Sequence, residues 1–150
     1  MKILMVCLGN ICRSPLAEGI MWTKVHEQGL DWQIDSAGTG SWHVGNPPDP
    51  RSRSVAQQYG IDISGQRARQ FKAGDLDEFD LVFAMDASNY QNILKHATDS
   101  RQEAKVHLIM NMADPGRNQG VPDPYWDDDG FEQVYQMLNR ACESIIATYA

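Results

Sequence analysis

The chain has 150 residues, a hydrophobic content of 42% and a formal net charge of −7. This length and apolar content suit a single domain over residues 1–150, with a core that needs no disulfide or metal to hold it together. The acidic balance, without a run of Lys and Arg, argues against a nucleic-acid partner, and no apolar stretch approaches the roughly 20 residues of a membrane helix.

Cysteine usage indicates free thiols in a reducing compartment. The three cysteines, Cys7, Cys12 and Cys142, are an odd number that fits no disulfide framework. The four histidines are scattered without ligand spacing, so we expect no metal and no other cofactor. The first residues form an apolar run without a small-residue cleavage site, which favours a buried strand over a signal peptide and predicts a cytoplasmic protein.

Short apolar runs alternate with helical patterns along the chain. The expected strands are residues 2–7, 32–37, 81–85 and 105–109. The expected helices are residues 14–28, 50–59, 88–96 and 131–149. Ser14 is expected to cap the first helix, with Pro15 at its first position. Segments 38–50 and 113–130, rich in turn-forming residues, are expected to be surface loops.

This order of elements predicts an α/β fold with a central parallel sheet and helices on both faces. Ligands of such folds bind beyond the carboxyl ends of the strands. Cys7 ends the first expected strand, so the tight loop that follows, residues 8–13, is the expected site.

The segment from Cys7 to Ser14 has the composition of an anion cradle. Cys7 and Arg13 stand six positions apart, across a strand-to-helix turn. The residues between them can wrap around a tetrahedral oxyanion with their backbone N–H groups inward, and the following helix adds the positive end of its dipole. Gly9 and Asn10 are residue types that tolerate the positive φ angles of such a wrap.

The same loop supplies a nucleophile and a clamp. An electropositive nest favours the thiolate form of Cys7, which is the form that attacks phosphorus. The planar fork of Arg13 can hold two phosphate oxygens, and the Ser14 hydroxyl can donate to the sulfur when it leaves. A lone strand cysteine is usually a packed core thiol. The coincidence of Gly, Asn, Arg and a Ser-Pro helix start in one short segment favours the catalytic interpretation.

The segment from Val6 to Pro15, VCLGNICRSP, resembles the phosphate-binding loop of the low-molecular-weight protein tyrosine phosphatases. The similarity continues along almost the whole chain, through segments 35–38, 42–45, 49–51, 68–70, 85–86 and 123–125. It implies a four-stranded parallel sheet, no metal and a covalent cysteinyl-phosphate intermediate. It also implies a phosphate-binding loop built from Leu8, Gly9, Asn10, Ile11, Cys12 and Ser14.

A carboxylic acid beside the loop is the usual source of the proton that the leaving oxygen needs. Asp49, Asp114 and Asp123 each precede a proline, for which turn initiation is the simplest explanation. Asp123 is the best candidate because Tyr125 and Trp126 follow it, and the resemblance places the family's general acid at the same position. In the second step, Asp123 would act as a base on the attacking water.

Aromatic residues on polar, Gly- and Pro-containing segments are expected to form a substrate rim. We interpret Trp42, Tyr125 and Trp126 as walls of a slot for a flat phosphoaryl group, against the simpler alternative of packing on loop neighbours. Leu8 and Ile11 are expected to project from the cradle onto the substrate ring.

The resemblance also implies supporting roles. Ser36 and Asp86 match family positions that brace the loop, and Gln66 stands where many relatives carry a histidine that supports the loop asparagine. Gln66 keeps the ability to hydrogen-bond but cannot titrate. Cys12 is close enough in sequence to trap an oxidised Cys7 as a reversible disulfide, an interpretation that stands beside that of a small packed thiol.

Two other activities of the same fold stand as alternatives. Thioredoxin-coupled arsenate reductases need two further cysteines, and only Cys142 remains. Protein arginine phosphatases tend to carry Thr where this loop has Ile11, and the bulk of Ile11 with the aromatic rim favours phosphotyrosine. An oxyanion-binding module without turnover would need neither a thiolate nor a proton donor. We expect a phosphotyrosine protein as substrate, inhibition by phosphate-like oxyanions, and a monomer or weak dimer.

Overall fold

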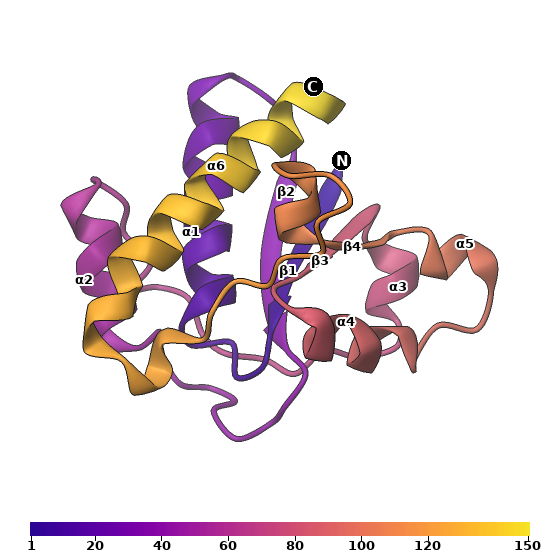
Figure 1. Ribbon diagram of the computed structural model, residues 1–150, viewed down its shortest axis with the longest axis horizontal. Coiled ribbons are helices and arrows are strands. Elements are labelled where there is room, and N and C mark those ends of the chain that lie inside the picture. Colours follow the sequence, from indigo (N-terminus) through magenta and orange to yellow (C-terminus); the bar gives the residue numbers. More distant parts are fainter.

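The computed structural model describes residues 1–150 as a sheet between two layers of helices (Figure 1). The strands are β1 (Lys2–Cys7), β2 (Gln33–Gly38), β3 (Leu81–Ala84) and β4 (Val106–Leu108). They form one parallel sheet in the order β2-β1-β3-β4. The predicted α/β fold with a four-stranded parallel sheet is confirmed.

Helices cover both faces of this sheet. The α-helices are α1 (Arg13–Glu27), α2 (Pro50–Gln58), α3 (Asp75–Glu78), α4 (Ala87–Leu94), α5 (Ser100–Glu103) and α6 (Phe131–Tyr149). Three short 3-10 helices are η1 (Ile109–Met112), η2 (Pro124–Trp126) and η3 (Asp128–Gly130). In Figure 1, α1, α2 and α6 lie on one side of the sheet, and α3, α4 and α5 lie on the other. None of the helices combines the length and the apolarity that crossing a bilayer requires.

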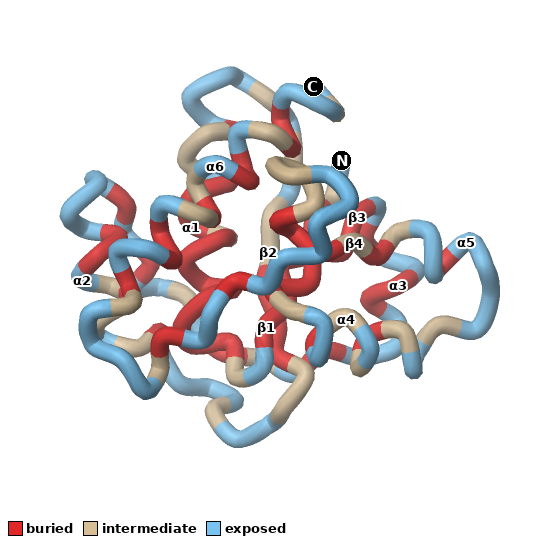
Figure 2. Tube along the Cα trace, viewed as in Figure 1, coloured by how far each residue is buried: buried red, intermediate tan, exposed pale blue.

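Side chains alternate along β1 between two cores, one on each face of the sheet. Ile3 and Met5 belong to the core shared with α1, α2 and α6, whereas Leu4 and Val6 belong to the core shared with α3 and α4. All four side chains are completely buried. A strand covered on both faces has a continuous apolar run instead of polar alternation, which explains the sequence of β1. Figure 2 shows burial concentrated along the sheet and the inner faces of the helices.

The local structure differs from the sequence-based expectations in two respects. The prediction that Ser14 caps the first helix is wrong, because α1 begins at Arg13 with Cys12 as N-cap and no side-chain capping bond. The Ser14 hydroxyl instead contacts the sulfur of Cys7. The helices α3 and α5 were not expected, because elements of four residues are too short to show helical periodicity.

The topology creates a crevice beside β1. Because β2 pairs with one edge of β1 and β3 with the other, the connections that leave the carboxyl ends of β1 and β3 diverge. Cys7 is the last residue of β1, and Asp86 follows shortly after β3. The fold therefore brings the loop after β1 and the segment after β3 to the same place.

Candidate active site

The loop after β1 is held with its carbonyl groups outward. The carbonyl oxygens of residues 7, 8, 11 and 12 accept hydrogen bonds of 2.8–2.9 Å from the segment 39–52. In a trans peptide the N–H points away from the C=O, and the chain contains no cis peptide. The amides that follow these carbonyls therefore point to the inner side of the loop, which is the geometry of an anion-binding nest. These amides belong to Leu8, Gly9, Cys12 and Arg13.

Asn10 and Gly38 fix the backbone of this loop. Asn10 has a φ of 57°, in the left-handed region that asparagine tolerates better than most residues. Its Oδ1 accepts from Arg69 N at 3.0 Å, and its Nδ2 donates to the hydroxyls of Ser14 and Ser36 at 2.8 and 2.9 Å. A Cβ at Gly38 would lie 2.8 Å from a loop carbonyl oxygen, so the end of β2 approaches the loop more closely than any side chain allows.

The sulfur of Cys7 lies inside the loop and faces hydrogen-bond donors. It is 3.0 Å from Ser14 Oγ and accepts from the backbone N–H of Asn10 at 3.3 Å. Cys7 is only 3% exposed. Hydrogen-bond donors thus face the sulfur from two sides, an arrangement that suits a nucleophile.

The guanidinium of Arg13 is buried beside this sulfur. Its Nη1 donates to Asp86 Oδ2 at 2.7 Å and to Val121 O at 3.0 Å. Its Nη2 lies 3.7 Å from Asp123 Oδ2. Burial opposes the positive charge, but the Cys7 sulfur and the two carboxylates outweigh burial and hold the pKa of Arg13 above its usual value. Arg13 is therefore a fixed and permanently charged donor.

The three aspartates that precede a proline have different partners in the structure. Asp49 caps α2 and forms an ion pair with Arg51 at 2.9 Å. Asp114 forms an ion pair of 2.9 Å with Arg140. Of these three aspartates only Asp123 lines the pocket that contains Cys7 and Arg13, so the aspartate that the sequence favoured is the one whose carboxyl group lies beside the guanidinium.

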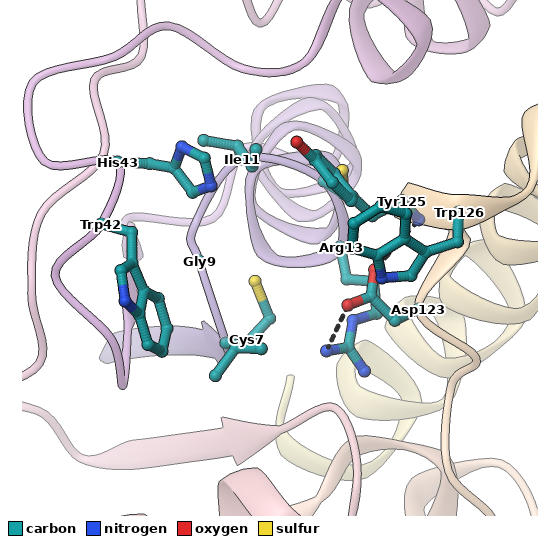
Figure 3. Close-up of a pocket in the computed structure, with 11 residues that line it drawn as sticks. Cys7, Gly9, Ile11, Arg13, Trp42, His43, Asp123, Tyr125 and Trp126 are labelled. Atoms are coloured by element: carbon teal, nitrogen blue, oxygen red, sulfur yellow. Dashed lines mark hydrogen bonds and ion pairs between the residues drawn. The ribbon is translucent and has the colours of Figure 1, made fainter.

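One pocket of about 280 Å³ joins these groups (Figure 3). In Figure 3, the Asp123 carboxylate lies beside the guanidinium of Arg13, and the sulfur of Cys7 points into the space next to them. The pocket is lined by Cys7, Leu8, Gly9, Ile11, Cys12, Arg13, Trp42, His43, Asp123, Tyr125 and Trp126. A cysteine sulfur, a guanidinium and a carboxyl group thus share one cavity with apolar walls.

Exposed aromatic rings form the mouth of this pocket. Trp126 is 87% exposed and Trp42 is 71% exposed, so neither ring belongs to the core. The ring of Tyr125 packs edge-on against Trp126, with 4.8 Å between ring centroids. Trp42 lies over Gly40, where a Cβ would overlap the indole. Flat apolar walls above an anion cradle suit an aromatic ring that carries a phosphate.

Comparison with known proteins identifies the family. The family model for low molecular weight phosphotyrosine protein phosphatases matches residues 2–149. The chain belongs to this family of cysteine-based hydrolases. It is 44% identical to the low molecular weight phosphotyrosine protein phosphatase of Schizosaccharomyces pombe, over 99% of this chain and 97% of that protein. It is 38% identical to the human phosphatase of the same name, over 97% of this chain and 93% of that protein.

Solved phosphatase structures share the fold closely. A crystal structure of a protein tyrosine phosphatase from Entamoeba histolytica matches with a TM-score of 0.92 at 36% identity, covering 99% of this chain and 96% of that one. A crystal structure of a Drosophila arginine phosphatase also matches with a TM-score of 0.92, at 34% identity and with 99% and 98% coverage. The backbone fold therefore does not separate phosphotyrosine from phosphoarginine as the group cleaved.

The three residues expected to support the phosphatase loop differ in what they contact. Ser36 Oγ accepts from the side chain of Asn10, and Asp86 binds the loop arginine. Gln66 lies elsewhere than expected, because its Nε2 donates to Pro15 O at 3.0 Å near the start of α1. The amide nitrogen of Asn10 is already engaged by two hydroxyls, so Gln66 braces the helix after the loop and not the asparagine.

Two residues at this site were not assigned from the sequence. His43 lines the pocket, and a Cβ at Gly9 would lie 3.1 Å from its ring. Its position directly after Trp42 was the available signal. Glu18 accepts from Ser36 Oγ at 2.6 Å. It follows Ser14 by four residues, which places both on one face of α1, but only the tertiary structure places Ser36 between Glu18 and the loop.

The other two thiols have environments unlike that of Cys7. All three cysteines are free and buried. Burial, with Asp49 and Cys7 nearby, raises the pKa of Cys12 far above its usual value and keeps it protonated. Cys142 is completely buried, with its Sγ 3.9 Å from Ala17 O.

Proposed function

We propose that the chain hydrolyses phosphotyrosine in proteins through a phosphate ester of Cys7. The observation that carries this proposal is the shared pocket in which Cys7 Sγ, the Arg13 guanidinium and the Asp123 carboxyl group lie below aromatic walls. Binding alone would require neither a sulfur surrounded by donors nor a carboxyl group beside it.

In the first step, the Cys7 thiolate attacks phosphorus, the S–P bond forms and the P–O bond to the tyrosyl oxygen breaks. The inward amides and Arg13 hold the phosphate oxygens, where negative charge accumulates in the transition state. Asp123 enters this step as the acid and gives its proton to the departing phenolate oxygen.

In the second step, water attacks the phosphorus of the cysteinyl phosphate. Asp123, now ionised, takes a proton from that water, and the S–P bond breaks to release inorganic phosphate. The Ser14 hydroxyl, 3.0 Å from the sulfur, stabilises the thiolate as it leaves. The enzyme returns to its starting state, with Cys7 ionised and Asp123 protonated.

A second candidate function is the hydrolysis of phosphoarginine, which the close match to a Drosophila arginine phosphatase favours. Ile11 and the exposed rings of Trp42 and Trp126 support phosphotyrosine instead, because they offer flat apolar surface to an aryl group. We expect a higher kcat/KM for a phosphotyrosine peptide than for the matching phosphoarginine peptide. Arsenate reduction finds little support, since the remaining thiol, Cys142, is completely buried between α1 and α6.

Further features of the biology belong to the same proposal. A thiol nucleophile needs a reducing environment, which supports a cytoplasmic location. The anion nest should bind phosphate-like oxyanions such as vanadate, which would inhibit the enzyme by occupying the loop. The exposed aromatic rim allows a monomer or a weak dimer that associates through this face.

The proposal is tested by the release of p-nitrophenol from p-nitrophenyl phosphate. Cys7→Ser should abolish turnover, and Asp123→Ala should lower kcat by about 100-fold or more while phosphate still binds. Asp114→Ala is the matched control, because Asp114 also precedes a proline but pairs with Arg140 away from the pocket. Full turnover in Cys7→Ser, or equal effects of the two aspartate substitutions, would refute these roles.

A further inference from the structure

A chain of hydrogen bonds leads from the sulfur of Cys7 to a carboxyl group on the far side of the loop. Ser14 Oγ is 3.0 Å from Cys7 Sγ, and Asn10 Nδ2 donates to Ser14 Oγ at 2.8 Å. The same Nδ2 donates to Ser36 Oγ at 2.9 Å, and Ser36 Oγ donates to Glu18 Oε1 at 2.6 Å. Glu18 thus stands at the end of a continuous path that starts at the nucleophile.

The donors in this path have a fixed direction. An amide NH₂ has two hydrogens and no acceptor, so Asn10 uses one hydrogen on Ser14 and the other on Ser36. Each hydroxyl accepts from Asn10 and keeps its single proton for the partner on its other side. The proton of Ser36 goes to the Glu18 carboxylate. The proton of Ser14 faces two acceptors, the sulfur of Cys7 at 3.0 Å and, at the longer distance of 3.4 Å, Ala37 O.

We propose that Glu18 is a positioning residue for the Cys7 thiolate. Its ionised carboxylate keeps Ser36 as a donor, and thereby holds the Asn10 side chain in the orientation that leaves the Ser14 proton for sulfur. A proton on Glu18 releases this constraint and makes Cys7 less reactive. The proposal rests on Cys7 being the nucleophile of the proposed function.

A neutral carboxyl group changes the pattern because it carries a proton of its own. It can donate that proton to Ser36 Oγ, which then no longer needs to point its own proton at Glu18. The hold on Asn10 weakens as a result. Asn10 is sensitive to such a change because its backbone is in the left-handed region and its side-chain bonds keep it there.

The charged groups around Glu18 leave its proton exchangeable near neutral pH. Burial and Asp35 on β2 raise the pKa of Glu18, whereas Ser36 and Arg69 lower it, and the result is about 7. Arg69 lowers the pKa of Glu18 only a little because its guanidinium is bound to Asp35 and to the buried Asp75. No hydrogen bond or ion pair from a cationic side chain reaches the Glu18 carboxyl group.

A groove on the side of α1 away from Cys7 gives this carboxyl group a route to solvent. The cavity measures about 640 Å³, and its walls include Glu18, Trp22, Asp62 and Gln66. Asp62 is the other ionisable group in its lining, and its pKa is lowered by hydrogen bonds from Ser64. Glu18 can therefore exchange a proton with solvent while the phosphate pocket is occupied.

The test is the rate at which iodoacetamide alkylates Cys7 in the full chain, from about pH 5.5 to about pH 9. Iodoacetamide is uncharged and does not titrate in this range, unlike phosphate, so every step in the profile belongs to the protein. We expect a wild-type step of about fivefold centred near pH 7, the effect of one hydrogen bond on the thiolate. Peptide mass mapping identifies the alkylated thiol as Cys7 and distinguishes it from Cys12, which lines the same pocket.

Glu18→Gln removes the titrating proton of Glu18 and keeps the acceptor for the Ser36 hydroxyl. The Gln carbonyl still accepts from Ser36 but cannot titrate, so the step near pH 7 should disappear while the rate at high pH stays within about twofold of wild type. Glu18→Ala removes the acceptor and should stay about fivefold slower throughout. Glu27→Gln, an exposed residue on the same helix, should match the wild type.

A step near pH 7 that persists in Glu18→Gln, or a wild-type profile without that step, overturns the proposal. Circular dichroism of each variant verifies that it is folded, and Glu18→Gln alone decides the question if Glu18→Ala does not fold. Failure of the proposed function would give a result different from failure of the Glu18 proposal. In that case Cys7→Ser retains phosphatase activity, whatever the profile of Glu18→Gln.

Discussion

Replacing Glu18 with Gln should make the free energy of unfolding less dependent on pH. Burial is the main reason that the pKa of this carboxyl group rises from 4.5 to about 7. The folded chain therefore holds the proton more tightly than the unfolded chain does. The resulting stability is fully present below about pH 4.5 and is lost as the pH rises through about 7.

The size of the effect follows from the difference between the folded and unfolded pKa. A rise from 4.5 to about 7 corresponds to about 3.5 kcal/mol, because each pKa unit is worth about 1.4 kcal/mol. Of this amount, about 2.5 kcal/mol is lost between pH 5 and pH 8. Since Gln does not titrate, the free energy of unfolding of Glu18→Gln should rise relative to wild type by about 2.5 kcal/mol over this range.

Urea denaturation followed by tryptophan fluorescence measures this difference at each pH. Subtracting the wild-type value removes the titration of every other group, and Glu27→Gln controls for the loss of a carboxylate at an exposed position on α1. A difference between Glu18→Gln and wild type that is flat within about 0.5 kcal/mol from pH 5 to pH 8 would refute the inference that burial raises this pKa.

Three further predictions concern the pocket. Gly40→Ala should displace the Trp42 ring, and steady-state kinetics should then show a KM for aryl phosphates that is several-fold higher with little change in kcat. An unchanged KM would mean that Trp42 does not touch substrate. Cys12→Ser should prevent the recovery of activity by dithiothreitol after brief peroxide treatment, and full recovery would remove Cys12 from the protection of Cys7. Asp86→Asn should cost about 3 kcal/mol of stability in urea denaturation, because the buried loop guanidinium loses the nearer of its two carboxylate partners. A loss below about 1 kcal/mol would contradict this.

The strands and the phosphate loop were predictable because their signals are local. Apolar runs identify β1 and β3, and the parts of the cradle from Cys7 to Ser14 are adjacent in sequence. Short elements were missed for the opposite reason, since α3 and α5 have too few residues for a period to appear. The prediction that Ser14 caps α1 was wrong because a Ser-Pro pair in the sequence does not reveal whether the hydroxyl caps a helix or faces a sulfur.

The sequence by itself determined the family and predicted the nucleophile and the clamp, because a chemical group and the backbone that presents it lie within one short turn. Only the tertiary structure decided which residues from distant segments complete the site. It paired Arg13 with Asp86, directed Gln66 to the start of α1, and placed Ser36 between Asn10 and Glu18. Side-chain hydrogen bonds and burial depend on what folding brings together, and no spacing along the chain encodes them.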